Sequence, residues 1–171
     1  IDDFLDFQLE PFKRFSKEQL NEWHGDFMRD IIDNMIVDYA HQLVQRHQEA
    51  DHLVAIVTAT NRFVTAPIAK RFGIDHLIAT EMEEKDGQYT GKPSGQPCFQ
   101  EGKIIKVNDW LVTLDKKLSD FQESYFYSDS ANDLPLLNQV THPVAVNPDS
   151  TLKAVAEEKG WPIIYYQKVN G

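Results

Sequence analysis

The first fifty residues carry apolar positions at helical spacing. A stripe at i, i+3, i+4, i+7 and i+8 predicts one face of an amphipathic helix ending near residue 47: Ile36, Tyr39, Ala40, Leu43 and Val44. Ser16 and Gln19 have the spacing of a capping box, in which each side chain bonds the backbone N–H of the other residue at a helix start. Residues 1–50 are therefore expected to form a helical layer or subdomain.

From residue 53 the pattern changes to short apolar runs that alternate with helical stretches. Strands are predicted at 53–57, 76–80, 125–127, 144–146 and 162–166, and helices at 63–72, 134–137 and 151–159. Gly73 and Gly160 stand where two of these helices should end, which suits a left-handed C-terminal cap. This alternation predicts an α/β fold with a parallel sheet and right-handed crossovers.

Two irregular stretches interrupt the alternation. Asp86-Gly87, inside residues 84–89, is a strong signal for a β-hairpin. Residues 91–97 are rich in Gly and Pro and predict a loop, which leads into a helix from about 102 to 118. No repeat or linker divides the chain of 171 residues, so we expect one domain with at most a small subdomain.

The net charge of the chain argues against some classes of binding partner. The formal net charge of -10 gives a field that repels polyanions, which argues against nucleic acid or an anionic membrane as the main partner. The only cysteine, Cys98, fits a reducing compartment. Residues 53–57 are far shorter than the roughly 20 apolar residues that span a bilayer, and no signal peptide is recognisable, so the expected location is the cytoplasm.

Polar side chains gather at predicted strand ends, where open α/β sheets bind ligands. Thr58 follows the first strand, Lys103 begins a helix, and Asp129 and Asp133 lie in the segment after the strand at 125–127. A hydroxyl, an ammonium and an acidic pair suit a phosphate bound together with Mg²⁺, which prefers oxygen ligands. Asp129 is the better metal ligand because it directly follows its strand, whereas Asp133 could ligate directly or through water.

The same charges suggest roles at the phosphate. Lys103 would neutralise phosphoryl oxygens, while Thr58 and the next backbone N–H, that of Ala59, would donate hydrogen bonds to them. Lys106 lies one helical turn from Lys103 and is the alternative cation. Simpler interpretations remain open: the acidic pair as a helix cap, Thr58 as a turn residue, and the lysines as solvated surface side chains.

Three segments in order carry a resemblance to a known family. Val-Thr-Ala-Thr at 57–60, Gly-Lys at 102–103 and Tyr-Ser-Asp-Ser-Ala-Asn-Asp-Leu-Pro-Leu-Leu at 127–137 resemble motifs two, three and four of the haloacid dehalogenase superfamily of phosphatases. The chain is most similar to the subgroup with phosphoserine phosphatase and histidinol-phosphatase-like enzymes. The resemblance extends from about residue 53 to residue 162.

This resemblance implies a Rossmann-like core, with helices on both faces of its sheet, and an inserted helical cap. The cap would occupy residues 1–50 and the core residues 51–171. The implied activity is Mg²⁺-dependent hydrolysis of a small phosphorylated metabolite through an aspartyl-phosphate. By matching motifs, it implies catalytic roles for Thr58 and Lys103, phosphate or substrate binding by Ala59 and Asn132, and metal binding by Asp129 and Asp133.

The family's first motif is not visible. It is a central strand ending in Asp-x-Asp, which supplies the nucleophile, whereas Asp2, Asp3 and Asp6 have the wrong spacing and read as an exposed helical face. Neighbouring strands would lose partners, at about 1–3 kcal/mol for each buried group. Because of this cost, we expect the strand and its nucleophile to belong to the natural protein upstream of Ile1, or the strand to be replaced by a partner, which would leave these residues inactive alone; the chain also begins without Met.

Two other functions share these residues. A binding or scaffold protein without catalysis would be expected if the natural protein also lacks Asp-x-Asp. A phosphotransferase would pass the phosphoryl group to an alcohol instead of water, with the same groups at the phosphate.

Overall fold

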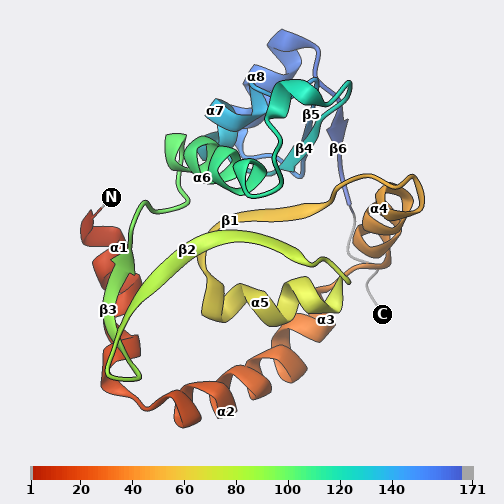
Figure 1. Cartoon of the computed structure of the whole chain (residues 1–171). Helices are drawn as coiled ribbons and strands as arrows, with labels where there is room; N and C mark the ends of the chain where they lie inside the picture. The colour runs from red at the N-terminus through yellow and green to blue at the C-terminus, as the bar shows by residue number, and fades with distance from the viewer. Residues whose placement is uncertain (1, 167–171) are drawn as a thin grey trace. The chain divides into compact units, whose positions relative to one another are not determined.

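The computed structural model describes residues 2–166, which are mainly helices joined to short strands (Figure 1). The chain divides into two compact units, residues 1–97 and residues 98–171. The side chains of Asp2, Asp3 and Asp6, expected on an exposed helical face, lie outside the described residues. None of the described helices combines the length and the apolar character needed to cross a bilayer.

The first unit begins with helices, as the apolar spacing predicts. They are α1 (Asp2–Leu9), the 3-10 helix η1 (Glu10–Arg14), α2 (Lys17–Phe27), the π-helix η2 (Met28–Ile32), α3 (Asp33–Met35) and α4 (Asp38–Glu49). The capping box at α2 is confirmed, because the Gln19 amide donates to Ser16 Oγ at 3.3 Å and the Ser16 amide donates to Gln19 Oε1 at 3.2 Å. Local sequence therefore sets where this helix starts.

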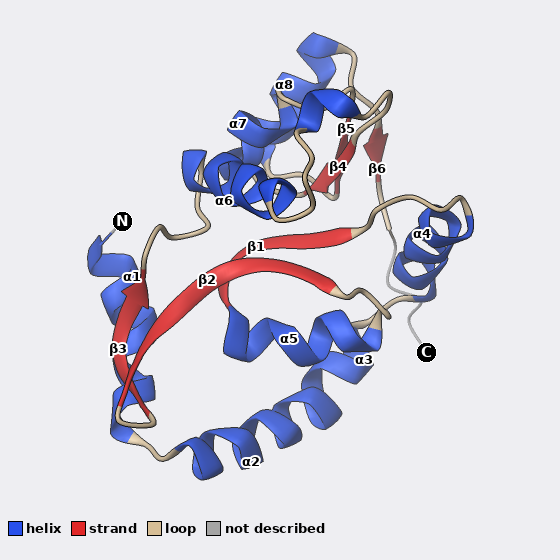
Figure 2. Ribbon diagram, viewed as in Figure 1, coloured by secondary structure: helices blue, strands red, loops and turns tan. Residues whose placement is uncertain are grey.

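Three strands and one helix complete the first unit: β1 (Ala55–Asn61), α5 (Arg62–Arg71), β2 (His76–Lys85) and β3 (Gln88–Ser94). β1 and β2 run parallel, with Val57 opposite Ile78, and α5 lies along this pair (Figure 1). β2 then curves away from β1 and pairs with β3 in an antiparallel hairpin (Figure 2). The predicted turn is confirmed, since Asp86 and Gly87 both have positive φ, at 51° and 79°.

Gly91 allows β3 to approach the helices that precede it. Its φ is +77°, and a Cβ added there would lie 3.2 Å from Glu10 Cα and 3.3 Å from Leu9 O. Any other residue would meet both backbone strain and an unusually tight contact with these backbone atoms. This glycine therefore fixes the contact between β3 and η1.

We expect Gly91→Ala to lower the free energy of unfolding by about 1–3 kcal/mol, because strain and overpacking act together. Gly25 is the matched control, because it lies inside α2 with nothing within 4 Å of an added Cβ. Gly25→Ala should stabilise the protein by about 0.5–1 kcal/mol. Urea unfolding of both variants measures the difference, and equal effects would contradict this account of Gly91.

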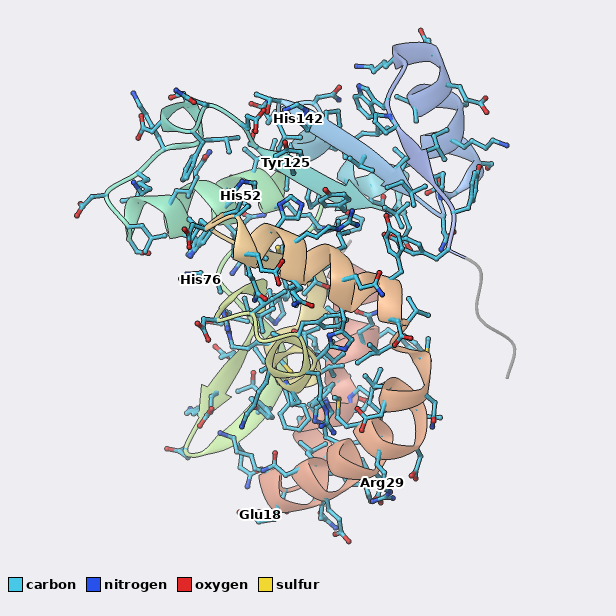
Figure 3. The ribbon with its side chains drawn as sticks, turned by 90° about the vertical axis from the view of Figure 1, so that its right-hand side faces the viewer. Glu18, Arg29, His52, His76, Tyr125 and His142 are labelled. Carbon is cyan, nitrogen blue, oxygen red and sulfur yellow. The ribbon has the colours of Figure 1, made fainter. Side chains whose placement is uncertain are left out.

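The second unit is built around a parallel sheet. Its elements are α6 (Glu101–Val112), η3 (Leu118–Asp120), β4 (Tyr125–Ser128), η4 (Ala131–Asp133), α7 (Leu134–Leu137), β5 (His142–Val146), α8 (Ser150–Lys159) and β6 (Ile163–Ile164). β5 pairs with both β4 and β6. The Tyr125 and His142 rings, labelled in Figure 3, stack at 4.4 Å across the first pair. Buried apolar residues from α7, β5 and α8 form the core of this unit: Leu137, Ala145, Leu152 and Ala156.

The structure differs from the sequence-based expectation in two places. The expected single sheet is present as two three-stranded sheets, and one strand, β3, is antiparallel. The helix expected to reach residue 118 ends at Val112, because Asp115 adopts a left-handed φ of 54° and the Lys116 amide bonds Leu111 O at 2.9 Å. The parallel pairs still make this a mixed α/β protein.

In the described structure, β1 and β4 each stand at an edge of their sheet. Among the described residues, β1 pairs only with β2, and β4 pairs only with β5. The further strand expected beside them stays a prediction. The proposed division into residues 1–50 and 51–171 also stays a prediction.

Candidate functional site

The second unit holds a buried ion pair at the carboxyl end of β4. Lys103 Nζ lies 2.5 Å from Asp133 Oδ1, and the two residues are only 6% and 8% exposed. The Phe126 ring faces the same ammonium at 5.9 Å from its centroid. A charge removed from water in this way needs a close partner, because desolvation costs several kcal/mol for each ion. Lys103 is therefore held in place by Asp133.

Ser128, the last residue of β4, connects this pair to the following loop. Its Oγ donates to Asp133 Oδ2 at 2.7 Å and accepts from the Ser130 amide at 3.1 Å. Both carboxylate oxygens of Asp133 are thus engaged, one by Lys103 and one by Ser128. Metal binding by Asp133, directly or through water, stays a prediction.

Lys103 and Lys106, the two candidate phosphate-binding lysines, differ in burial and in their contacts. Lys103 is in the first turn of α6, is buried and pairs with Asp133, whereas Lys106 is half-buried one turn further along. Lys103 is thereby the lysine whose position is fixed by the loop after β4. Its role at a phosphate stays a prediction.

Asp129 directly follows β4 and is exposed. Its backbone is held from the next strand-to-helix connection, because the Asp149 amide donates to Asp129 O at 2.8 Å. The Asp149 carboxylate also accepts from the Leu152 amide at 2.8 Å and from the Ala131 amide at 2.7 Å. Asp149 thus caps α8 and supports the loop that carries Asp129.

These bonds make the stability of the second unit depend on pH. Hydrogen bonds from the amides of Leu152 and Ala131 hold the pKa of the Asp149 carboxyl below its ordinary value. Stability from such a group is present above the ordinary pKa of about 4 and is lost as the pH falls through the lower, folded-state pKa. The carboxylate is therefore needed in its charged form.

We expect Asp149→Ala to destabilise the protein by about 0.5–2 kcal/mol near neutral pH, as for other lost caps. The difference from wild type should shrink as the pH is lowered below about 4, since the wild type then loses the same bonds. Urea unfolding at pH 7 and at successively lower pH measures it. A difference that stays constant with pH would contradict the capping role.

Thr58, Ala59 and Asn61 lie at the end of β1, in the first unit. Thr58 Oγ1 accepts from the Thr60 amide at 3.2 Å, and Ala59 O accepts from Thr80 Oγ1 at 2.7 Å. Asn61 is buried and caps α5, with its Oδ1 accepting from the Val64 amide at 3.0 Å. The strand end is thus fixed by local bonds, with Thr58 half-buried at its predicted place.

Asn132 is exposed in the loop after β4, and its backbone N–H donates to Ser130 Oγ at 3.2 Å. Its Oδ1 accepts a bond from Gln100 Nε2, and these two atoms are 3.4 Å apart. Gln100 immediately precedes α6, the helix that carries Lys103. The predicted residues of the second unit therefore belong to one loop and one adjoining helix start.

The loop after β4 carries oxygen ligands suited to a hard cation. Within the described part of the chain, no group of three or more His, Cys, Asp or Glu side chains is arranged to hold a metal ion. Mg²⁺ is often bound by only one or two carboxylates plus water and substrate phosphate. The exposed Asp129 and the neighbouring Asp133 fit that pattern, which keeps Mg²⁺ as a prediction.

Sequence reasoning missed three residues of this region: Gln100, Ser128 and Asp149. For Asp149 a signal existed, because Asp followed by Ser-Thr just before a helical stretch is a typical N-cap. Ser128 and Gln100 gave no such signal, since their roles come from contacts with residues elsewhere in the chain.

Comparison with known families decides the relationship. The family model described as haloacid dehalogenase-like hydrolase matches residues 2–138. The chain belongs to this family. The resemblance seen in the sequence is thereby confirmed at the level of the family, and the chain is a haloacid dehalogenase-like hydrolase in the group that includes phosphoserine and histidinol phosphatases.

Curated relatives within the family include two named phosphatases. The chain is 45% identical to a histidinol-phosphatase of Neisseria meningitidis over 98% of its length and 76% of that protein. It is 35% identical to the phosphoserine phosphatase SerB1 of Mycobacterium tuberculosis, over 78% of this chain and 42% of that protein. The chain therefore spans only part of these haloacid dehalogenase-like hydrolases.

Solved structures agree with the family fold. A protein of unknown function from Bordetella pertussis Tohama I has 48% sequence identity and a TM-score of 0.93, covering 95% of this chain and 73% of that one. A substrate-bound phosphoserine phosphatase complex has 22% identity and a TM-score of 0.56, covering 73% and 56% of the two chains. The second likeness shows the haloacid dehalogenase fold alone.

Proposed function

We propose that the protein is a Mg²⁺-dependent phosphomonoester hydrolase acting on a small phosphorylated metabolite. The carrying observation is the buried Lys103–Asp133 pair beside the exposed Asp129, at the end of β4. The similarity to a protein named histidinol-phosphatase supports histidinol phosphate as the first substrate to test, and phosphoserine is the second. Both compounds are phosphate esters of amino alcohols.

In this proposal Lys103 donates to phosphoryl oxygens and stabilises the charge that builds up on them during transfer. Asp133 holds the ammonium in position, and Ser128 fixes the carboxylate of Asp133. Thr58 Oγ1 and the Ala59 amide donate to the phosphate from the end of β1, and Asn132 adds an amide donor. Residues 1–50 would form the cap that excludes water from the reacting groups.

Asp129 would hold Mg²⁺ directly, and Asp133 would reach it through water. When bound, the ion neutralises phosphate charge and so makes the phosphorus open to attack. The attacking group in this proposal is an aspartate upstream of Ile1, which forms the aspartyl-phosphate that water then hydrolyses. Alone, residues 1–171 would therefore be inactive.

The test is phosphate release by the natural full-length protein from histidinol phosphate, phosphoserine and a generic aryl phosphate, with and without Mg²⁺. We expect Mg²⁺-dependent release from at least one of them and no release by residues 1–171. Product analysis with an added alcohol separates hydrolysis from transfer. Absence of release from all three substrates would favour the non-catalytic binding protein instead.

A further inference from the structure

Gln100 has a backbone conformation that its residue type does not favour. Its φ of 48° and ψ of -121° lie in a region that glycine adopts freely and other residues adopt only with strain. The other non-glycine residues with positive φ in the described part of the chain are all Asp or Asn, which tolerate such angles: Asp51, Asp86, Asp115 and Asn147. Gln100 is the exception among them.

The backbone itself gives no reason for a glutamine. The conformation lets Gln100 O accept the Lys103 amide at 3.0 Å, which starts α6 with Lys103 in its first turn. Glycine would provide the same bond without strain. Strained backbone conformations of this kind concentrate at functional sites. The reason for a glutamine at position 100 must therefore lie in its side chain.

That side chain leads to the loop after β4. Gln100 Nε2 donates to Asn132 Oδ1, and this bond engages neither Gln100 Oε1 nor Asn132 Nδ2. The pair therefore offers one acceptor and one donor to a ligand. Lys103 lies three residues along from Gln100, and Asp133 directly follows Asn132. The amide pair thus stands beside the groups proposed above to act on the phosphate.

Asn132 Nδ2 and Gln100 Oε1 can bind different parts of a substrate. A phosphate monoester dianion only accepts hydrogen bonds, so Asn132 Nδ2 can bind it and Gln100 Oε1 cannot. Gln100 Oε1 instead needs an N–H or O–H donor. We propose that Gln100 determines specificity by accepting a hydrogen bond from the ammonium group of an amino-alcohol phosphate. This inference rests on the proposed phosphatase function and adds the part of the substrate that is recognised.

Three variants of the natural full-length protein test this proposal. Gln100→Leu keeps the bulk and the strain but removes the acceptor. Gln100→Gly removes both the acceptor and the strain. Asp115→Gly is the matched control, because Asp115 also has a positive φ in the second unit but follows α6 rather than preceding it. Each variant is assayed with histidinol phosphate, phosphoserine and an aryl phosphate that has no ammonium group, and its thermal unfolding is followed.

The readout is the ratio of kcat/KM for the better amino-alcohol phosphate to kcat/KM for the aryl phosphate. A lost bond to a charged group lowers this ratio by about 10- to 100-fold in both Gln100 variants. Gln100→Gly should also raise Tm by about 2–5 °C, because relief of strain outweighs the added freedom of the unfolded chain. Asp115→Gly should leave the ratio unchanged and move Tm by less than about 2 °C.

The possible outcomes are distinct. An unchanged ratio in Gln100→Leu, with active wild type, overturns the specificity role while the phosphatase function stands. A Gln100→Gly protein that is less stable than wild type overturns the argument from strain. A wild type that hydrolyses none of the substrates removes the proposed function and this inference with it.

Discussion

Lys103→Met is expected to lower the free energy of unfolding by about 3–5 kcal/mol, because it leaves the buried Asp133 carboxylate without its cation. Asp133 is 8% exposed, so water cannot replace the lost partner without opening the unit. Ser128 still donates to one oxygen, but a neutral hydroxyl does not compensate a full charge. Urea unfolding followed by circular dichroism measures the loss.

Lys106→Met is the control for Lys103, because it removes the same charge one turn along from a half-buried position. It should change stability by no more than about 0.5 kcal/mol. In the double variant Lys103→Met with Asp133→Leu, the buried charge is gone and much of the stability should return. Equal losses at Lys103 and Lys106, or a double variant as unstable as Lys103→Met, would contradict the buried pair.

Asp129→Asn is expected to reduce Mg²⁺-dependent phosphate release by about 10²–10³-fold or more, while the protein stays folded. The reason is that the proposed direct ligand loses its charge at a position that is exposed in the structure. The same exposure means that unfolding should change by no more than about 0.5 kcal/mol. Phosphate release at several Mg²⁺ concentrations, with unfolding measured in parallel, separates the two effects.

Glu158→Gln provides a matched control for Asp129. Glu158 is an exposed acid in α8 of the same unit, so its change alters net charge by the same amount. Activity should remain near the wild-type value. If Asp129→Asn kept full Mg²⁺-dependent activity, Asp129 would not be the ligand and the proposed cation site would have to move.

Signals local in sequence predicted the fold well. The capping box at Ser16 and the Asp86-Gly87 turn were both confirmed, because each depends on residues within a few positions of one another. The short apolar runs located β1, β4 and β5 to within a few residues. β2 was predicted five residues too short, since its second half is polar and owes its strand conformation to pairing with β3.

The site could be predicted only in part for the same reason. Motif order pointed to Lys103 and Asp133, but their pairing joins positions 30 apart in the chain and depends on how α6 packs against α7. Ser128 and Gln100 act through bonds to side chains in other segments. Apolar periodicity contains no information about such bonds, so the sequence located the motifs without showing how Asp133 is used.

β2 also has a consequence for motion within the first unit. One continuous backbone pairs with β1 near Thr80 and with β3 beyond it, and Gly91 of β3 touches the Glu10 backbone. The Thr80 hydroxyl bonds Ala59 O, next to Thr58. A displacement of the N-terminal helices must therefore bend β2 or break these bonds. The N-terminal helices and the strand end at Thr58 are therefore expected to unfold together rather than one after the other.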